Sequence, residues 1–293
     1  MKSFYFKYIA GLLLFGSNGL FITQIHLSSS GIAFYRALLG ALFLGIIYLF
    51  SGNKKKMFRY KKETLFIIIS GVAMGADWLL LFEAYKQIGV SLGILLNYCG
   101  PALVIAFSPL VLKEALTKEK IIALAAALLG MCLINVQAAS TGMSILGLSC
   151  GVLSALTFAV MVFANKKAIH IQGLGNATLQ TITTAVVIAV FVGLKEGIPT
   201  DVVTGDWLPI LWLGLINTGL GCYLYFSGVN ELPAQTVALC GYLEPLSAVF
   251  FSVAFLGEIM LPLQILGAVL ILGGAIYGEC SKTKVKQPVP HRQ

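Results

Sequence analysis

Two stretches of this chain, LLNYCGPALVIAFSPLVLKE at 95–114 and LCGYLEPLSAVFFSVAFLGE at 239–258, indicate how the whole sequence is organised. They lie 144 positions apart and align without a gap. The identical residues include an ordered Tyr-x-x-Pro, a Phe-Ser pair and a Glu at the end of each stretch. Leu and Gly matches are common in apolar sequences, but this ordered set is not, so the pattern indicates a duplication.

The residues around both stretches are strongly apolar. Of 293 residues, 58% are hydrophobic and only 11% are charged, and the mean hydropathy is +0.90. A soluble domain carries roughly 25% charged residues, and a bilayer core is crossed by about 20 apolar residues in a helix. The runs are continuous rather than alternating, which excludes a β-barrel. The sequence therefore predicts an all-α integral membrane protein with ten transmembrane helices near 8–25, 32–50, 65–83, 92–112, 121–138, 144–164, 177–194, 207–227, 235–256 and 261–279.

The basic residues predict which way the spans run. Seventeen Lys and Arg fall in alternate gaps, which the positive-inside rule places in the cytoplasm. The opposite gaps hold only Lys86 and Lys195, and Arg36 lies within a span. Both termini are therefore expected in the cytoplasm, and the net charge of +8 indicates contact with membrane lipid rather than with nucleic acid. The cytoplasmic set is Lys2, Lys7, Lys54, Lys55, Lys56, Arg59, Lys61, Lys62, Lys113, Lys118, Lys120, Lys166, Lys167, Lys282, Lys284, Lys286 and Arg292.

The duplication and the number of spans together predict an inverted repeat. The first five-helix repeat is expected over 6–138 and the second over 144–279, followed by a disordered basic cytoplasmic tail at 281–293. Because five is an odd number, the second repeat enters the membrane from the opposite face. Inverted pairs commonly form alternating-access transporters with a site near the midplane, at the repeat interface.

These motifs resemble a known family. The order Asn97-Tyr98-Cys99-Gly100-Pro101 before Glu114, and Tyr242-Leu243-Glu244-Pro245 before Glu258, is similar to the twin EamA domains of bacterial drug/metabolite transporters. The resemblance covers about residues 6–279. It implies a ten-helix fold with a central cavity, a location in the bacterial cytoplasmic (inner) membrane, and export of amino acids or other small metabolites. The sequence departs from the family pattern at Lys113, opposite Gly257, and it has Gly100 opposite Glu244.

Glu244 is the first candidate for substrate binding or proton coupling. It is expected about halfway along the ninth span, where an ionised carboxylate is costly unless it is paired, protonated or facing water. The neighbouring Pro245 removes a backbone donor and frees a carbonyl near Gly241. Asn97 and Pro101 are the matching break in the first repeat. Packing roles remain the alternative for all of these residues, and Tyr98, Tyr242, Trp78 and Asn18 are further candidates for the cavity wall.

Arg36 and Asp77 are expected at similar depths, each about five residues inside the outer end of consecutive spans. Pairing would lower the cost of two charges in lipid. The prediction is a structural ion pair between these helices, with gating or anion binding as the alternative. Glu114 and Glu258 close the fourth and ninth spans, and each is expected to cap the N-terminus of the span that follows it.

The predicted function is secondary active transport of small amphipathic metabolites, with protons as the candidate coupling ion. The chain shows no nucleotide-binding motif and no metal-ligand spacing among its three His, so no cofactor, metal or ATP is expected. A membrane-embedded lipid or isoprenoid enzyme is the alternative from another class, but the acids are isolated rather than clustered, and no enzyme activity is predicted. A channel would need a continuous polar lining. A metabolite importer of the same fold remains open.

Overall fold

The structure, a computed structural model, describes residues 2–51, 59–134, 144–195, 197–257 and 261–280. Throughout these ranges the secondary structure is helical, without strands. The first half contains α1 (Lys2–Gly16), α2 (Asn18–Ile22), α3 (Ser29–Phe50), α5 (Lys61–Ile88), α6 (Val90–Asn97), α7 (Cys99–Val111) and α8 (Lys118–Ile134).

The second half is likewise helical in its described residues. It contains α9 (Ile145–Lys166), α10 (Leu174–Lys195), a 3-10 turn η2 (Thr204–Asp206), α11 (Trp207–Leu211), a π-helical segment η3 (Trp212–Leu220), α12 (Gly221–Val229), α13 (Ala234–Gly241), α14 (Leu243–Leu256) and α15 (Pro262–Cys280).

Eight of the described helices, or runs of continuous helices, are long and apolar enough to cross a membrane. The prediction of an all-α membrane protein is confirmed. The expected fifth and tenth spans correspond to α8 and α15, which are not among those eight. The end of the fifth expected span, the terminal tail and Glu258 lie outside the described residues. Exposed Leu and Ile side chains cover the outside of the bundle, as a lipid-facing surface requires.

The fourth and ninth expected spans are broken at matching positions. The fourth consists of α6 and α7, which meet at Tyr98, and the ninth consists of α13 and α14, which meet at Tyr242. Pro101 and Pro245 each lie three residues after the break, in the first turn of the second helix. A proline has no backbone N–H to give to the preceding turn, so the helix is interrupted where the sequence predicts it.

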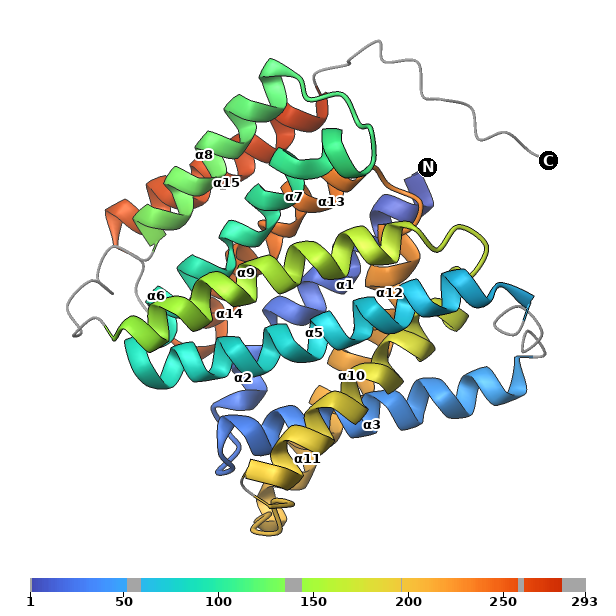
Figure 1. Cartoon of the computed structure of the whole chain (residues 1–293). Coiled ribbons are helices and arrows are strands. Elements are labelled where there is room, and N and C mark those ends of the chain that lie inside the picture. The colour runs from blue at the N-terminus through green and yellow to red at the C-terminus, as the bar shows by residue number, and fades with distance from the viewer. Residues whose placement is uncertain (1, 52–58, 135–143, 196, 258–260, 281–293) are drawn as a thin grey trace.

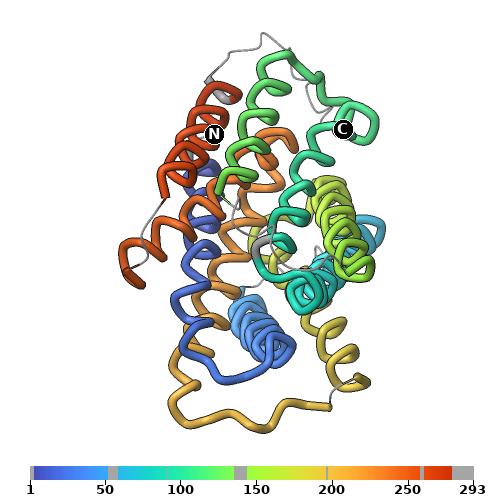
Figure 2. Tube along the Cα trace, turned by 90° about the vertical axis from the view of Figure 1, so that its left-hand side faces the viewer, coloured from blue at the N-terminus to red at the C-terminus, as the bar shows by residue number. Residues whose placement is uncertain are grey.

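Helices from the two halves pack against each other throughout the molecule (Figure 1). The most extensive contacts are α5 with α9, α8 with α15, α3 with α10, α5 with α10, and α1 with α12. Figure 2 shows α8 and α15 side by side from a second direction. Their backbones are so close that a Cβ atom on Gly130 would lie 2.5 Å from the carbonyl oxygen of Gly267. Only glycine permits this approach, which strengthens van der Waals contact between membrane helices.

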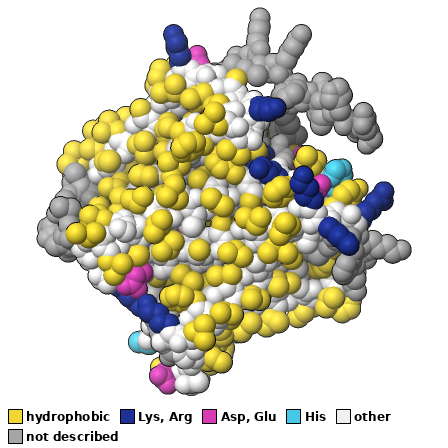
Figure 3. Space-filling view, viewed as in Figure 1, with side chains coloured by type: hydrophobic (Ala, Val, Ile, Leu, Met, Phe, Trp, Pro, Cys, Tyr) yellow, Lys and Arg dark blue, Asp and Glu magenta, His cyan; other side chains and the backbone are white. Residues whose placement is uncertain are grey.

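Apart from Arg36, Asp77 and Glu244, the charged side chains of the described residues lie toward the ends of the predicted spans. Figure 3 shows a broad hydrophobic face with Lys and Arg gathered mainly toward one edge. The start of α1, the start of α5 and the end of α9 lie toward that same side (Figure 1). The charged groups inside the bundle are therefore few, and each requires a specific explanation.

Candidate functional site

Asp77 lies inside the bundle with amide and hydroxyl partners. Its side chain is buried, and its Oδ1 accepts a hydrogen bond of 2.7 Å from Asn97 Nδ2. The same amide nitrogen donates to Ser154 Oγ at 3.2 Å. Asn97 occupies the last turn of α6, directly before the break at Tyr98, so the break in the fourth span positions the donor for Asp77. These contacts join α5, α6 and α9.

Arg36, on α3, lies in a second polar cluster, which includes Trp78, the residue after Asp77 on α5. Its Nε donates to Thr218 Oγ1 at 3.0 Å, and its guanidinium carbon lies 4.3 Å from the centre of the Trp78 ring. The buried cation is thus stabilised by an aromatic face and a hydroxyl rather than by a carboxylate. Because Asp77 and Trp78 are consecutive residues of α5, the two clusters meet on that helix.

The predicted ion pair between Arg36 and Asp77 is not formed. Each side chain has other partners, and the ion pairs among the described residues do not include this one. The reason is the packing of α3, which lies mainly against α10 and η3 and makes few contacts with α5. The prediction assumed that consecutive spans are neighbours, and here the neighbours of α3 come from the other half of the chain.

Glu244 lies near these clusters without direct contact to them. It is half-buried in the first turn of α14, and within the described part of the chain its carboxylate has no hydrogen-bond or ion-pair partner. It interacts electrostatically with Arg36 and with Asp77. A carboxylate, a cation and a second carboxylate therefore face the interior of one bundle. Glu244 is the only one of the three without a direct polar partner among the described residues.

A third break brings Asn18 close to Glu244. The helix of the first span is interrupted at Ser17, where Asn217 Nδ2 donates to Asn18 Oδ1 at 2.9 Å and to Ser17 Oγ at 3.0 Å. Directly before the break, a Cβ atom on Gly16 would lie 2.8 Å from the Glu244 carbonyl oxygen. Glycine at this position lets α1 approach the backbone of α14, so the segment that carries Asn18 packs beside the one that carries Glu244.

The two tyrosines at the helix breaks are in contact. The hydroxyl of Tyr242 donates to the carbonyl oxygen of Tyr98 at 3.0 Å, and the ring centres are 6.2 Å apart. Tyr242 is fully buried, and Pro101 and Pro245 are buried beside the breaks. The structure therefore gives Tyr242 a packing role between the halves, while Asn97, Asp77 and Trp78 take part directly in the polar clusters.

Glu114 caps a different helix from the one expected. Its carboxylate accepts from the backbone N–H groups of Ala234 at 2.7 Å and Gln235 at 3.1 Å, at the start of α13. The prediction placed this cap on the following helix, α8. Nearby, the ammonium of Lys166 donates to the carbonyl oxygens of Val229 and Leu232 around the end of α12. A carboxylate at a helix start and a cation at a helix end both match the helix dipole.

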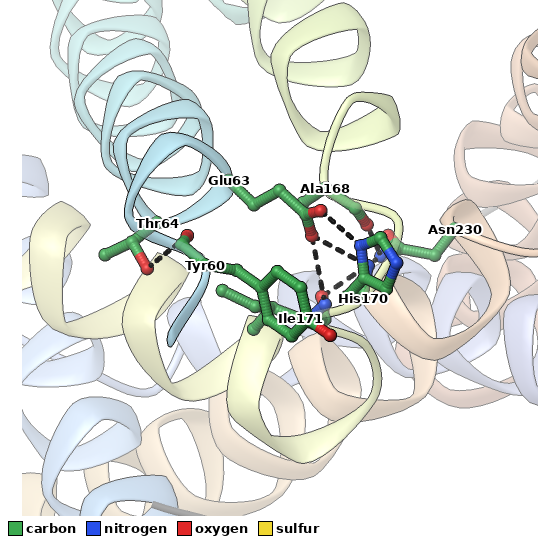
Figure 4. A network of polar contacts seen from close by, with 7 residues as sticks. All are labelled: Tyr60, Glu63, Thr64, Ala168, His170, Ile171 and Asn230. Atoms are coloured by element: carbon green, nitrogen blue, oxygen red, sulfur yellow. Dashed lines mark hydrogen bonds and ion pairs between the residues drawn. The ribbon is translucent and has the colours of Figure 1, made fainter. Parts of the chain in front are cut away.

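Two histidine–carboxylate contacts join the halves at opposite ends of the bundle. His26 donates its backbone N–H to Asp206 Oδ2 at 3.1 Å, and its Nδ1 lies 2.9 Å from Oδ1. His170 donates its backbone N–H to Glu63 Oε2 at 2.7 Å, and its Nδ1 lies 2.5 Å from Oε1 (Figure 4). His26 and His170 are 144 positions apart, the same offset as the repeated motifs. The offset relates the two histidines but not their partners, because the positions that match Asp206 and Glu63 are Lys62 and Trp207.

No pattern in the sequence singles out Thr218, Ser154 and Asn217, the hydroxyl and amide partners of the clusters. All three are buried. They lie on the sixth and eighth spans, opposite the residues that were selected, and a Ser or Thr in an apolar run carries no distinctive signal because it can also bond its own helix backbone. Their role follows only from knowing which helices are neighbours.

Both halves of the chain match the same protein-family model. The model of the EamA-like transporter family matches residues 3–136 and again residues 145–277. The chain belongs to the EamA-like transporter family. The resemblance seen in the sequence is confirmed, and this EamA-like protein is a multi-pass membrane transporter.

Several relatives of this EamA-like transporter are themselves transporters without an assigned substrate. The uncharacterized transporter YxxF of Bacillus subtilis is 27% identical over 92% of this chain and 86% of its own length. An uncharacterized transporter of Helicobacter pylori is 26% identical over 89% of each chain. The protein PecM of Dickeya dadantii is 24% identical over 71% of each chain. A crystal structure with 17% identity matches with a TM-score of 0.83 over 96% of this chain and 97% of its own, which shows the fold.

Proposed function

We propose that this EamA-like protein is a proton-coupled secondary transporter that exports amino acids or related small amphipathic metabolites across a bacterial cytoplasmic membrane. The observation that carries the proposal is the set of three charges within the spans of a largely apolar bundle, Arg36, Asp77 and Glu244, of which Asp77 and Glu244 lie beside helix breaks. Charges in this environment are expensive, and in membrane proteins they commonly mark substrate or proton pathways.

The paired contacts support ten helices in two inverted five-helix repeats. The contact of α5 with α9 corresponds to the contact of α12 with α1 when 144 is added to or subtracted from each residue number. The hydrogen bond from Arg36 to Thr218 corresponds in the same way to the contact of Gln180 Nε2 with Met74 Sδ, at 3.6 Å. Two halves that use the same contacts in exchanged positions are suited to rocking between two equivalent states.

The chemistry of the clusters supports a zwitterionic substrate. The Arg36 guanidinium presents several N–H donors in a fork that fits a carboxylate, and only its Nε is used by Thr218. Glu244, with no direct polar partner in the described part of the chain, offers an acceptor for an ammonium group or a proton. Trp78 adds an aromatic surface for an apolar side chain. An α-amino acid carries all three complementary groups.

The direct test is a panel of amino acids and related metabolites in proteoliposomes that contain the purified protein, with and without an imposed pH gradient. The proposal expects substrate movement that accelerates when protons can flow in the opposite direction, and a substrate-induced pH change inside the vesicles. Transport that ignores the pH gradient would contradict proton coupling. Accumulation only with substrate and protons moving in the same direction would identify an importer instead.

The proposed orientation has a separate test. With the six native cysteines replaced, a single cysteine at Lys167 is expected to be protected in intact cells from a membrane-impermeant maleimide, and a single cysteine at Asp201 to be labelled. Both residues are exposed in the structure. Labelling of both from the outside would contradict the proposed orientation. Further single cysteines near Lys56 and Lys286 are expected to behave like Lys167, and one near Gly142 like Asp201.

A further inference from the structure

An open groove with a volume of about 800 Å³ lies where α5 begins and where α7 and α9 end. Its lining includes the apolar side chains of Phe66, Val111, Leu112 and Ile169, and one carboxylate, from Glu63. The groove is strongly basic, since six cations line it: Arg59, Lys61, Lys62, Lys113, Lys166 and Lys167.

The one carboxylate in this groove is already engaged. Glu63 accepts hydrogen bonds from the backbone N–H groups of His170 and Ile171 and contacts the His170 ring, which stacks on Tyr60 with ring centres 4.3 Å apart (Figure 4). Lys166 is held by backbone carbonyls. Among the described ion pairs, none includes any of the other five cations. The groove therefore keeps a positive charge that no group of the described chain neutralises.

Lys113 occupies a strained position in the groove. Its φ is 58°, and it is the only residue other than glycine with a positive φ in the described part of the chain. The residue 144 positions later is Gly257, which adopts the same left-handed conformation, with a φ of 71°, where glycine is unstrained. A lysine at such a position destabilises the turn, and strain of this kind is commonly kept where a side chain has a function.

The opposite end of the bundle shows that the fold does not need these cations. The residues offset by 144 from Arg59, Lys61, Lys62 and Lys113 are Val203, Gly205, Asp206 and Gly257. None of these four is basic, although the backbone of Gly257 matches that of Lys113.

We propose that this groove binds the phosphate headgroup of an anionic phospholipid from the membrane leaflet on its side, a site that rests on the membrane placement proposed above. The phosphate would lie among Lys113, Lys167 and Arg59, and the acyl chains would lie against the apolar side chains of the lining. One of these, Val111, is the last residue of α7, which also presents Leu110, 79% exposed, and Phe107, 46% exposed. These neighbouring apolar side chains favour a lipid over a soluble phosphate, which needs only the charges. Clusters of Lys and Arg at the cytoplasmic surface attract anionic lipid electrostatically.

The test compares the thermal unfolding of the full chain in nanodiscs of phosphatidylcholine alone and of phosphatidylcholine with phosphatidylglycerol. Phosphatidylglycerol is expected to raise the Tm of the wild type by about 3–6 °C, because a ligand that binds only the folded state stabilises it. Lys113→Gly is expected to raise the Tm in phosphatidylcholine, since the strain is removed, and to lose at least half of the phosphatidylglycerol increment. Lys167→Gln is expected to lose a similar share of the phosphatidylglycerol increment, without a higher Tm in phosphatidylcholine.

Lys118→Gln is the matched control, because it removes one exposed charge on α8 outside the groove. It is expected to keep the full increment. Native mass spectrometry of the same samples should show phosphatidylglycerol retained by the wild type and by Lys118→Gln, and lost from Lys113→Gly. The lipid site is wrong if the wild type gains no stability from phosphatidylglycerol, if Lys118→Gln loses as much as Lys113→Gly, or if glycerol phosphate in phosphatidylcholine nanodiscs gives the same increment. None of these readouts uses transport, so their failure leaves the proposed function standing.

Discussion

Two interior contacts of this EamA-like transporter occupy matching positions and differ in chemistry. In one, the Arg36 guanidinium donates to the Thr218 hydroxyl; in the other, 144 positions away at each partner, the Gln180 amide lies against the Met74 sulfur. The backbone arrangement is thus used twice, while the charge occurs once. Glu244 differs in the same way from Gly100, and Asp77 from Gly221. The fold is shared by the two halves, and the interior charges depend on single substitutions in one half or the other.

The largest expected effect comes from Glu244, which the other half replaces by glycine. Gln keeps the size of the side chain and cannot exchange a proton, so Glu244→Gln is expected to abolish transport driven by a pH gradient while leaving folding and some substrate binding intact. The measurement is flux in proteoliposomes over pH of about 5 to 8. Glu231→Gln, an exposed carboxylate, is the control. Wild-type flux in Glu244→Gln over this range would show that Glu244 does not carry the coupling proton. If only Asp77→Asn lost flux, Asp77 on α5 would be the coupling residue instead.

Arg36→Gln makes the first half match the second at this position. The amide can still bond to Thr218, so the protein is expected to fold, but the site loses its cation. A charge-assisted hydrogen bond contributes about 1.5–3 kcal/mol, so substrate affinity is expected to fall roughly 10- to 100-fold. Equilibrium binding of the substrate identified in the transport panel measures this, with Arg59→Gln as a charge-matched control at the bundle end. Unchanged affinity in Arg36→Gln would show that the guanidinium serves packing alone.

The Asp77–Asn97 contact has no counterpart, because the matching positions are Gly221 and Gly241. Asn97→Leu leaves a buried carboxylate without its donor and is expected to destabilise the folded protein by about 1–3 kcal/mol. Adding Asp77→Leu is expected to recover part of that loss. In contrast, the losses in unfolding free energy caused by Arg36→Gln and by Asp77→Leu should be additive to within about 0.5 kcal/mol, since the two side chains have different partners. Chemical denaturation in mild detergent measures the free energy of unfolding of the single and double variants in both pairs. Strong coupling between Arg36 and Asp77 would support the ion pair that the sequence predicts.

The smallest expected effect tests whether the two histidine contacts are equivalent. His26 and His170 use the same backbone and ring atoms on a carboxylate, and both rings are largely exposed. His26→Ala and His170→Ala are each expected to lower the Tm by about 1–3 °C, because an exposed imidazole contributes little and the backbone N–H bonds to the carboxylates remain. Differential scanning fluorimetry of both variants and of the double variant measures this. A much larger loss for either one would show that the two ends of the bundle are not secured alike.

The sequence was sufficient for what the bilayer imposes and insufficient for which helices become neighbours. Long apolar runs have to form helices in lipid, so most spans were predictable, and Pro101 and Pro245 predicted where two of them break. Neighbours depend on packing between distant segments, which hydropathy does not encode. The prediction of an Arg36–Asp77 pair was wrong for this reason. The prediction for Glu114 was wrong for the same reason, since its carboxylate caps α13 rather than α8. The same limit hid Thr218 and Ser154.

The hydrogen bond between the two tyrosines at the helix breaks has a consequence for the speed of transport. In this structure it runs from the Tyr242 hydroxyl to the Tyr98 carbonyl oxygen. If the repeats exchange conformations, symmetry predicts the reverse bond in the other state, from the Tyr98 hydroxyl to the Tyr242 carbonyl oxygen. A bond that is equally strong in both end states cannot favour either of them, because only a difference in free energy shifts an equilibrium. The bond is broken only in the transition between the two states, so it contributes to the activation barrier of each half-cycle. It therefore affects the rate of the transition and not the equilibrium between the states.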